Sequence, residues 1–154
     1  MDGAEILQLM GKSDVLLEKF RGVFSKDAIV FLRPLAPGGF IFNSLPMSQP
    51  GPGHWLALYK PEDEELPCTF FDSIGRPPSF YGMMFPEERI VYNDRRLQAP
   101  GTDTCALYCI LFLYLEFIGT DLFDILKVFS KDTLRNEEVV VEFARDLLSG
   151  TLQQ

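Results

Sequence analysis

The chain has 154 residues, a net charge of −8 and 47% hydrophobic residues. This length and apolar content exclude a disordered chain and allow one domain with a sizeable core, so we expect a single domain over residues 1–154. The acidic balance excludes a generic binder of nucleic acid or anionic membrane, because neutralising phosphates requires Lys and Arg. We therefore expect a monomer that binds neither DNA nor a membrane.

The three cysteines indicate a reducing compartment. Their number is odd and their positions suggest no disulfide framework. The acidic start, residues 1–5, does not resemble the basic beginning of a signal peptide. The most apolar run, residues 105–118, is shorter than a membrane-spanning helix requires. We expect an intracellular protein, in the nucleus or cytoplasm.

The first third of the chain reads as two helices followed by a short strand. Residues 3–10 favour a helix that ends at Gly11, and Ser13 is a candidate N-cap for a second helix reaching Phe20. Residues 21–27 are interpreted as a connector. Residues 28–32 are predicted to form a short strand.

Strands dominate the middle of the chain. We predict strands at residues 40–45, 54–60, 68–72 and 89–93, with a short helix at 78–84. The acidic turn between the second and third of these strands predicts a hairpin.

The last third is helical. Residues 105–118 form a buried helix, and Asp121 is expected to cap a helix over residues 122–129. Asp132 or Thr133 caps a final helix that ends at Gly150. Helices, then strands, then helices indicate the α+β class, with a mainly antiparallel sheet packed on a central buried helix and flanking helices around it.

The strongest chemical feature lies where a polar loop meets the central helix. Residues 98–104 are polar and contain Pro100 and Gly101, and Cys105 begins the apolar run. A thiol in the first turn of a helix is close to the positive end of the helix dipole and to free backbone N–H groups. Both favour the thiolate, so Cys105 is a candidate nucleophile if a base lies beside it.

The candidate base is His54, the only histidine in the chain. It follows a loop rich in Pro and Gly and begins a predicted strand. Asp72 ends the strand predicted to pair with it, so hairpin pairing would bring the carboxylate to the imidazole. A carboxylate in that place fixes the imidazole tautomer and stabilises the imidazolium. The alternatives are a surface or capping histidine and an aspartate that only ends a strand.

Two further residues are candidates for the same site. Gln98 lies in the loop before the helix, where its amide could donate to an oxyanion together with the backbone N–H of Cys105. Trp55 could lie over the imidazolium by a cation–π contact and shape the cleft. The alternatives are an ordinary loop residue for Gln98 and core packing for Trp55.

The remaining cysteines are interpreted as structural. Cys109 lies one helical turn beyond Cys105, and both Cys109 and Cys68 are expected to be small buried hydrophobes. A zinc site built from His54 and the three cysteines lacks the usual short-turn spacing of ligands. We expect neither a metal nor another cofactor.

The order His54-Trp55, Asp72, then Gln98 through Cys105 and Cys109 resembles the adenovirus-type cysteine proteases (adenain). It resembles more distantly the Ulp/SENP deSUMOylating proteases of the same clan. The resemblance spans about residues 40–115 and includes Phe70–Gly75. Residues 20–27 resemble, more weakly, adenain-like proteases of Maverick/Polinton elements and related DNA viruses.

The resemblance implies an α+β, papain-like fold and a set of roles. Cys105 would be the nucleophile, His54 the general base and then acid, Asp72 the orienting carboxylate, and Gln98 an oxyanion donor. Cleavage would follow a small residue, often glycine, and the substrates would be viral or mobile-element precursor proteins or ubiquitin-like tails. Packaging in the virion would follow for a viral enzyme.

Three departures from the family pattern bear on function. Ala106 stands where the family commonly has glycine. Its methyl group would be tolerated if the helix has already begun there, and would otherwise narrow the oxyanion site. The acidic composition argues against activation by DNA, and the short segment after the last helix suggests that the region for an activating peptide is reduced or absent. Three functions stay open: an endopeptidase, an isopeptidase acting on ubiquitin or a ubiquitin-like modifier, and an inactive module that binds such modifiers.

Overall fold

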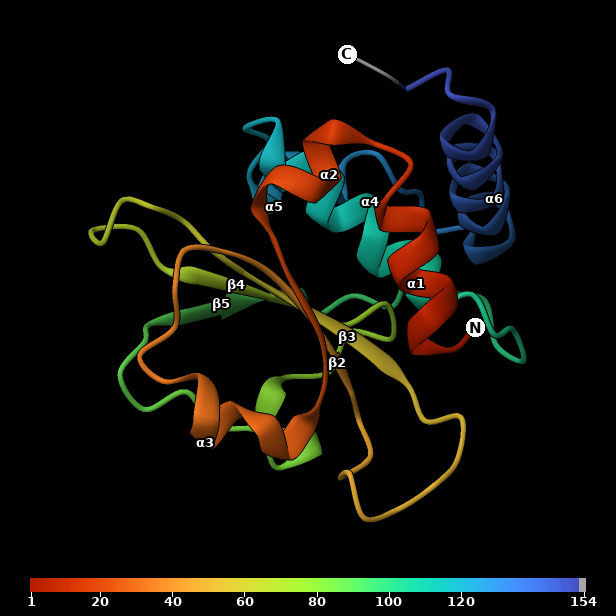
Figure 1. Cartoon of the computed structure of the whole chain (residues 1–154). Coiled ribbons are helices and arrows are strands. Elements are labelled where there is room, and N and C mark those ends of the chain that lie inside the picture. Colours follow the sequence, from red (N-terminus) through yellow and green to blue (C-terminus); the bar gives the residue numbers. More distant parts are fainter. Residues whose placement is uncertain (153–154) are drawn as a thin grey trace.

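The computed structural model of the chain describes residues 1–152. Its helices are α1 (Gly3–Met10), α2 (Asp14–Lys19), α3 (Ile29–Leu32), α4 (Cys105–Phe117), α5 (Leu122–Leu126) and α6 (Thr133–Ser149). The strands are β1 (Phe20–Ser25), β2 (Gly38–Asn43), β3 (Trp55–Lys60), β4 (Cys68–Phe71) and β5 (Ile90–Tyr92). Two short 3-10 helices are η1 (Lys26–Ala28) and η2 (Pro78–Tyr81). Figure 1 shows the sheet crossing the molecule, with most helices on one side of it.

The five strands form one sheet in the order β1-β2-β3-β4-β5. The predicted hairpin is confirmed, because β3 pairs antiparallel with β4. The α+β class is confirmed as well, but the sheet is mixed. The two central pairs, β2–β3 and β3–β4, are antiparallel, whereas the outer pairs β1–β2 and β4–β5 are parallel. The outer strands join the sheet through longer connections, which sequence patterns do not reveal.

Two predictions near the N-terminus are wrong. The segment interpreted as a connector is β1, and its pairing with β2 is a contact distant in sequence. The segment predicted to be a strand instead contains the end of η1 and the helix α3. Its apolar residues suggested a strand, but Val30 and Phe31 lie in α3 and are 63% and 87% exposed.

The sheet is covered on both faces, which explains why its strands are almost wholly apolar. Side chains alternate between the faces along each strand. Ile41, Ala57 and Phe71 face the core formed with α1, α2, α4 and α6. Their neighbours face a second core beside α3 and η2: Phe40, Phe42, Leu56, Leu58 and Phe70.

Helix α4 is the central element predicted from the apolar run. It begins at Cys105, and eleven of its thirteen residues are buried. It packs across the sheet so closely that a Cβ on Gly39 would lie 2.6 Å from the ring of Phe117. Within the described residues, every helix is too short or too polar to cross a membrane.

The predicted caps of the two C-terminal helices are confirmed, but α5 ends at Leu126 and not at the predicted residue 129. The side chain of Asp121 accepts a hydrogen bond from the Asp124 backbone N–H at the start of α5. Asp132 caps α6 in the same way, and Gly150 ends α6 in a left-handed conformation with φ 79°.

Candidate active site

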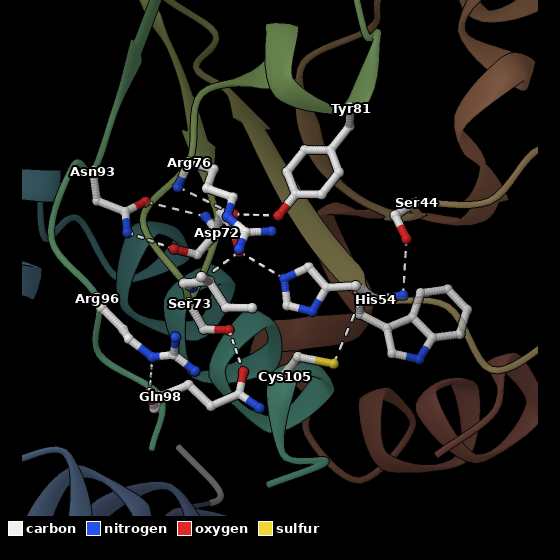
Figure 2. Close-up of polar contacts among 12 residues, drawn as sticks. Ser44, His54, Asp72, Ser73, Arg76, Tyr81, Asn93, Arg96, Gln98 and Cys105 are labelled. Carbon is white, nitrogen blue, oxygen red and sulfur yellow. Dashed lines mark hydrogen bonds and ion pairs between the residues drawn. The ribbon is translucent and has the colours of Figure 1, made fainter. Parts of the chain in front are cut away.

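Strand pairing brings His54 and Asp72 together. His54 directly precedes β3 and Asp72 directly follows β4, so both lie at the same end of the antiparallel pair. Imidazole Nε2 lies 2.6 Å from Asp72 Oδ1, as Figure 2 shows. This contact leaves Nδ1 of the imidazole for another partner.

The carboxylate of Asp72 is fully buried but well supplied with hydrogen-bond donors. Oδ1 also accepts from the backbone N–H of Ile74 at 3.0 Å, and Oδ2 accepts from the Arg76 backbone N–H at 3.1 Å and from the Tyr81 hydroxyl at 2.5 Å. Burial alone would raise the pKa of Asp72, but the bonds from His54, Tyr81 and Ile74 outweigh it and lower the pKa. The carboxylate is therefore held ionised beside the imidazole.

The backbone of Asp72 is held by Asn93, which is itself fully buried. Asn93 Nδ2 donates to the Asp72 carbonyl oxygen at 2.6 Å, and Asn93 Oδ1 accepts from the Asp72 N–H at 3.1 Å. The sequence placed Asn93 only at the end of a strand. The Asn93 side chain binds the backbone N–H and C=O of one residue 21 positions away, and no sequence pattern marks such a contact.

Cys105 is the first residue of α4, and its Sγ accepts a hydrogen bond from the Trp55 backbone N–H at 3.4 Å. Burial raises the pKa of the Cys105 thiol. The hydrogen bond to His54, the N–H groups of Trp55 and Ala106 and the charge of the imidazolium lower it, and the net pKa lies below its ordinary value. The methyl group of Ala106 does not prevent its N–H from contributing.

His54 shows the matching shift. Its burial alone would lower the imidazole pKa, but the hydrogen bonds and negative charges of Asp72 and Cys105 raise that pKa to about 9. A lowered thiol pKa beside a raised imidazole pKa favours a thiolate at Cys105 and an imidazolium at His54. The arrangement can supply a nucleophile and a proton at one place.

The other two thiols lack this environment. Cys109 is fully buried, and burial together with the charges of Cys105 and Asp72 raises its pKa far above the ordinary value. Burial and the nearby Glu88 raise the pKa of Cys68 to about 12. Cys68 belongs to the core on the opposite face of the sheet from Cys105. Among residues 1–152, no group of three or more His, Cys, Asp or Glu side chains is placed to hold a metal ion.

Gln98 is buried, and both the oxygen and the nitrogen of its side-chain amide form hydrogen bonds. Oε1 accepts from the Ser73 hydroxyl at 2.6 Å, and Nε2 donates to the carbonyl and the hydroxyl oxygens of Thr102, both at 3.0 Å. Ser73 follows Asp72, so this bond links the loop of Gln98 to the loop of Asp72 (Figure 2). Both amide hydrogens are already used, and donation to an oxyanion would require one of them to turn from Thr102.

Trp55 does not make the predicted contact with the imidazole. The ring stacked on His54 is that of Tyr81, with 6.0 Å between ring centroids and 26° between the planes. The Trp55 indole N–H donates to the Met1 carbonyl oxygen at 2.9 Å, and the side chain is 7% exposed. Trp55 also lines a pocket with Leu45 and Met47 from the loop before β3, so its role in shaping the cleft stays a prediction.

The loop that leads to Cys105 is held by the first turns of α6. Asn136 Nδ2 donates to the Leu97 carbonyl oxygen at 3.0 Å. The Glu137 carboxylate accepts from the Ala99 backbone N–H at 3.1 Å and from the Thr104 hydroxyl at 2.6 Å. No pattern in the sequence marks these residues, because the groups that they bind in this loop lie more than 30 positions away.

Comparison with solved structures identifies the fold. The chain is similar to ChlaDub1 from Chlamydia trachomatis, with 15% identity and a TM-score of 0.53, over 96% of this chain and 77% of that one. It is also similar to the central domain of an uncharacterized Lpg1148 protein from Legionella pneumophila, with 13% identity and a TM-score of 0.48, over 96% and 98% of the two chains. No protein-family model and no curated protein matches the sequence. The likeness to ChlaDub1 shows that the two chains share one fold.

Proposed function

We propose that the chain is a cysteine protease whose nucleophile is Cys105. The observation that carries this proposal is the connected set of Cys105, His54 and Asp72, in which the thiol pKa is lowered and the imidazole pKa is raised to about 9. The fold shared with ChlaDub1 supports the same class of enzyme. A buried carboxylate that holds one imidazole nitrogen leaves the other for the thiol, which is the arrangement that a thiol hydrolase needs.

The proposed reaction has two steps. The Cys105 thiolate attacks the scissile carbonyl carbon, and the imidazolium of His54 protonates the leaving amine to give a thioester and neutral imidazole. Water then attacks the thioester while His54 accepts its proton, which releases the acid product and regenerates the thiolate. Asp72 keeps the imidazole oriented and stabilises its charged form in both steps.

The proposed oxyanion donors are the backbone N–H of Cys105 and the amide of Gln98. Buried and held between Ser73 and Thr102, Gln98 has little conformational freedom to lose when substrate binds. One of its N–H groups would exchange the Thr102 oxygen for the oxyanion, a small rotation that hydrogen bonds in substrate-free sites commonly require.

Two substrate classes follow from this chemistry. The resemblance to adenain favours an endopeptidase that cleaves virion or mobile-element precursors after small residues. The shared fold with ChlaDub1, whose name denotes a deubiquitinase, favours an isopeptidase acting on ubiquitin or a ubiquitin-like protein. A panel of ubiquitin-like C-terminal probes beside a set of Gly-Gly-X peptides separates them, since reaction with the probes alone would exclude the endopeptidase.

The proposal is tested with Cys105→Ala and its matched control Cys109→Ala. We expect Cys105→Ala to reduce turnover to background, and Cys109→Ala to keep it, since only the first thiol has a lowered pKa. Iodoacetamide at about pH 6, followed by mass mapping, should modify Cys105 ahead of both other thiols. Normal turnover by Cys105→Ala, with loss in Cys109→Ala, would show that the nucleophile is misassigned. If the unaltered chain neither turns over peptides nor reacts with the probes, both enzymatic functions are excluded and the inactive binding module remains.

A further inference from the structure

Tyr81 touches two members of the site without belonging to the set found from the sequence. It is the last residue of η2, and its side chain is 9% exposed. Its hydroxyl donates to Asp72 Oδ2 at 2.5 Å, and its ring stacks on the His54 imidazole at 6.0 Å between centroids. Figure 2 shows the hydroxyl pointing to the carboxylate on the side away from Cys105.

Tyr81 is held from outside the site. Its carbonyl oxygen accepts from Lys26 Nζ at 2.9 Å, and the chain turns directly after it at Gly82, whose φ is 70°. Its side chain belongs to the core beneath the sheet, not to the core around α4. The position of its hydroxyl therefore does not depend on the helix that carries Cys105.

The hydroxyl is needed because an aspartate carboxylate turns easily about its last side-chain bond. Asp72 Oδ1 is shared by His54 and the Ile74 N–H. Without Tyr81, Oδ2 would keep only the bond from the Arg76 N–H at 3.1 Å. The negative charge of the Asp72 carboxylate would then be stabilised by one hydrogen bond fewer, and the plane of the carboxylate would be less firmly held.

We propose that Tyr81 is a positioning residue of the site, whose hydroxyl fixes Asp72 Oδ2 so that Oδ1 faces His54, and whose ring covers the imidazole. This inference rests on the proposed function, since it assigns Tyr81 a part in orienting the base. Tyr81 acts through Asp72 and does not contact the thiol or the scissile bond.

The direction of its effect follows from the charged groups around the base. His54 faces Asp72, Cys105 and the Tyr81 ring, and Tyr81 in turn is close to the Arg76 guanidinium and bonded to Lys26. Removing the hydroxyl removes a hydrogen bond that disperses the Asp72 charge. The carboxylate then attracts the imidazolium more strongly, so the pKa of His54 rises.

The test compares Tyr81→Phe with the unaltered chain and with Tyr59→Phe, which removes the same atom from a half-buried tyrosine beside Phe117. His54 is the only histidine, so an NMR titration of labelled histidine reports on this residue alone. We expect its pKa to rise by about half a unit or more in Tyr81→Phe and to be unchanged in Tyr59→Phe. We also expect kcat/KM to fall roughly three- to tenfold in Tyr81→Phe only.

A second variant shows whether Tyr81 acts through the carboxylate. In an Asp72→Asn background, adding Tyr81→Phe should change neither the His54 pKa nor kcat/KM any further. An unchanged His54 pKa in Tyr81→Phe would overturn the proposal, as would an additive effect in the double variant. The titration does not require turnover. If the unaltered chain hydrolyses nothing, the proposed function fails, while a shifted His54 pKa still supports the contact network.

Discussion

The two halves of the candidate site are held by different kinds of structure. The hairpin half consists of His54 and Asp72, placed by the backbone pairing of β3 with β4. The loop half consists of residues 97–105, which carry Gln98 and end at Cys105. Its anchors are side chains of α6, namely Asn136 and Glu137, together with Ser73.

This difference indicates which part of the site tolerates the loss of a single side chain. Strand pairing distributes the placement of His54 over several backbone hydrogen bonds, so no single side chain on the strands decides it. The loop half has two backbone hydrogen bonds, from the Leu97 and Gln98 N–H groups to the Ser73 carbonyl oxygen. Otherwise it depends on a few polar side chains, of which Asn136 and Glu137 each bond to two or three groups. We therefore expect substitutions in the hairpin half to change the His54 pKa and the rate of reaction. We expect substitutions around the loop half to change the position of the loop and leave the His54 pKa unaltered.

After the loss of turnover expected for Cys105→Ala, the next largest effect is expected in the hairpin half for Asp72→Ala. The imidazole loses its orienting carboxylate, and the ion pair with Cys105 loses its support, so kcat/KM should fall roughly 100- to 10,000-fold. The His54 pKa should also fall, because the hydrogen bond and charge of Asp72 raise it. Asp63→Ala, in the exposed turn of the same hairpin, is the control. Retention of the His54 pKa near 9 in Asp72→Ala would contradict the pairing.

A smaller effect is expected in the loop half for Gln98→Ala. If the amide stabilises the oxyanion, kcat should fall roughly 10- to 100-fold, while the His54 pKa stays at its unaltered value. The exposed Gln8→Ala on α1 is the control. A lower melting temperature with normal kcat would instead identify Gln98 as an ordinary loop residue, the alternative that the sequence left open.

The hairpin half could be predicted because its signals are local. A lone histidine at the start of one strand and an aspartate at the end of the next need only the pairing of neighbouring strands to meet. Cys105 could be placed for a similar reason, since the change from polar to apolar residues marks the start of α4. The helix caps Asp121 and Asp132 follow from the same short-range rules.

The rest depends on contacts between distant segments. Tyr81, Asn93 and Glu137 are common residue types whose hydrogen-bond partners are set by the fold, and no spacing marks them. The same limit explains the parallel outer strands and α3. Val30 and Phe31 looked like strand residues, yet they lie in α3 and are exposed, because the strand that pairs with β2 is the preceding segment β1.

Within the loop half, a smaller effect on activity than that of Gln98→Ala is expected for Glu137→Gln, which tests how this half is held. The Glu137 carboxylate accepts from Ala99 N–H, the Thr104 hydroxyl and the Tyr108 hydroxyl, the last at 2.5 Å. A neutral amide offers one acceptor oxygen in place of two, so the loop and the first turns of α4 lose part of their support. We expect unfolding free energy to fall by about 1–3 kcal/mol and kcat to fall about three- to tenfold.

Three measurements separate this effect from those in the hairpin half. The His54 pKa should not change, because Glu137 does not face the imidazole, and Glu138→Gln on the exposed neighbour should leave stability and kcat unaltered. In the double variant with Gln98→Ala, the losses in kcat should not add, since both act on the same loop. Full additivity would show that Gln98 and Glu137 do not act on the same loop. A shift of the His54 pKa in Glu137→Gln would show that the two halves are not held independently.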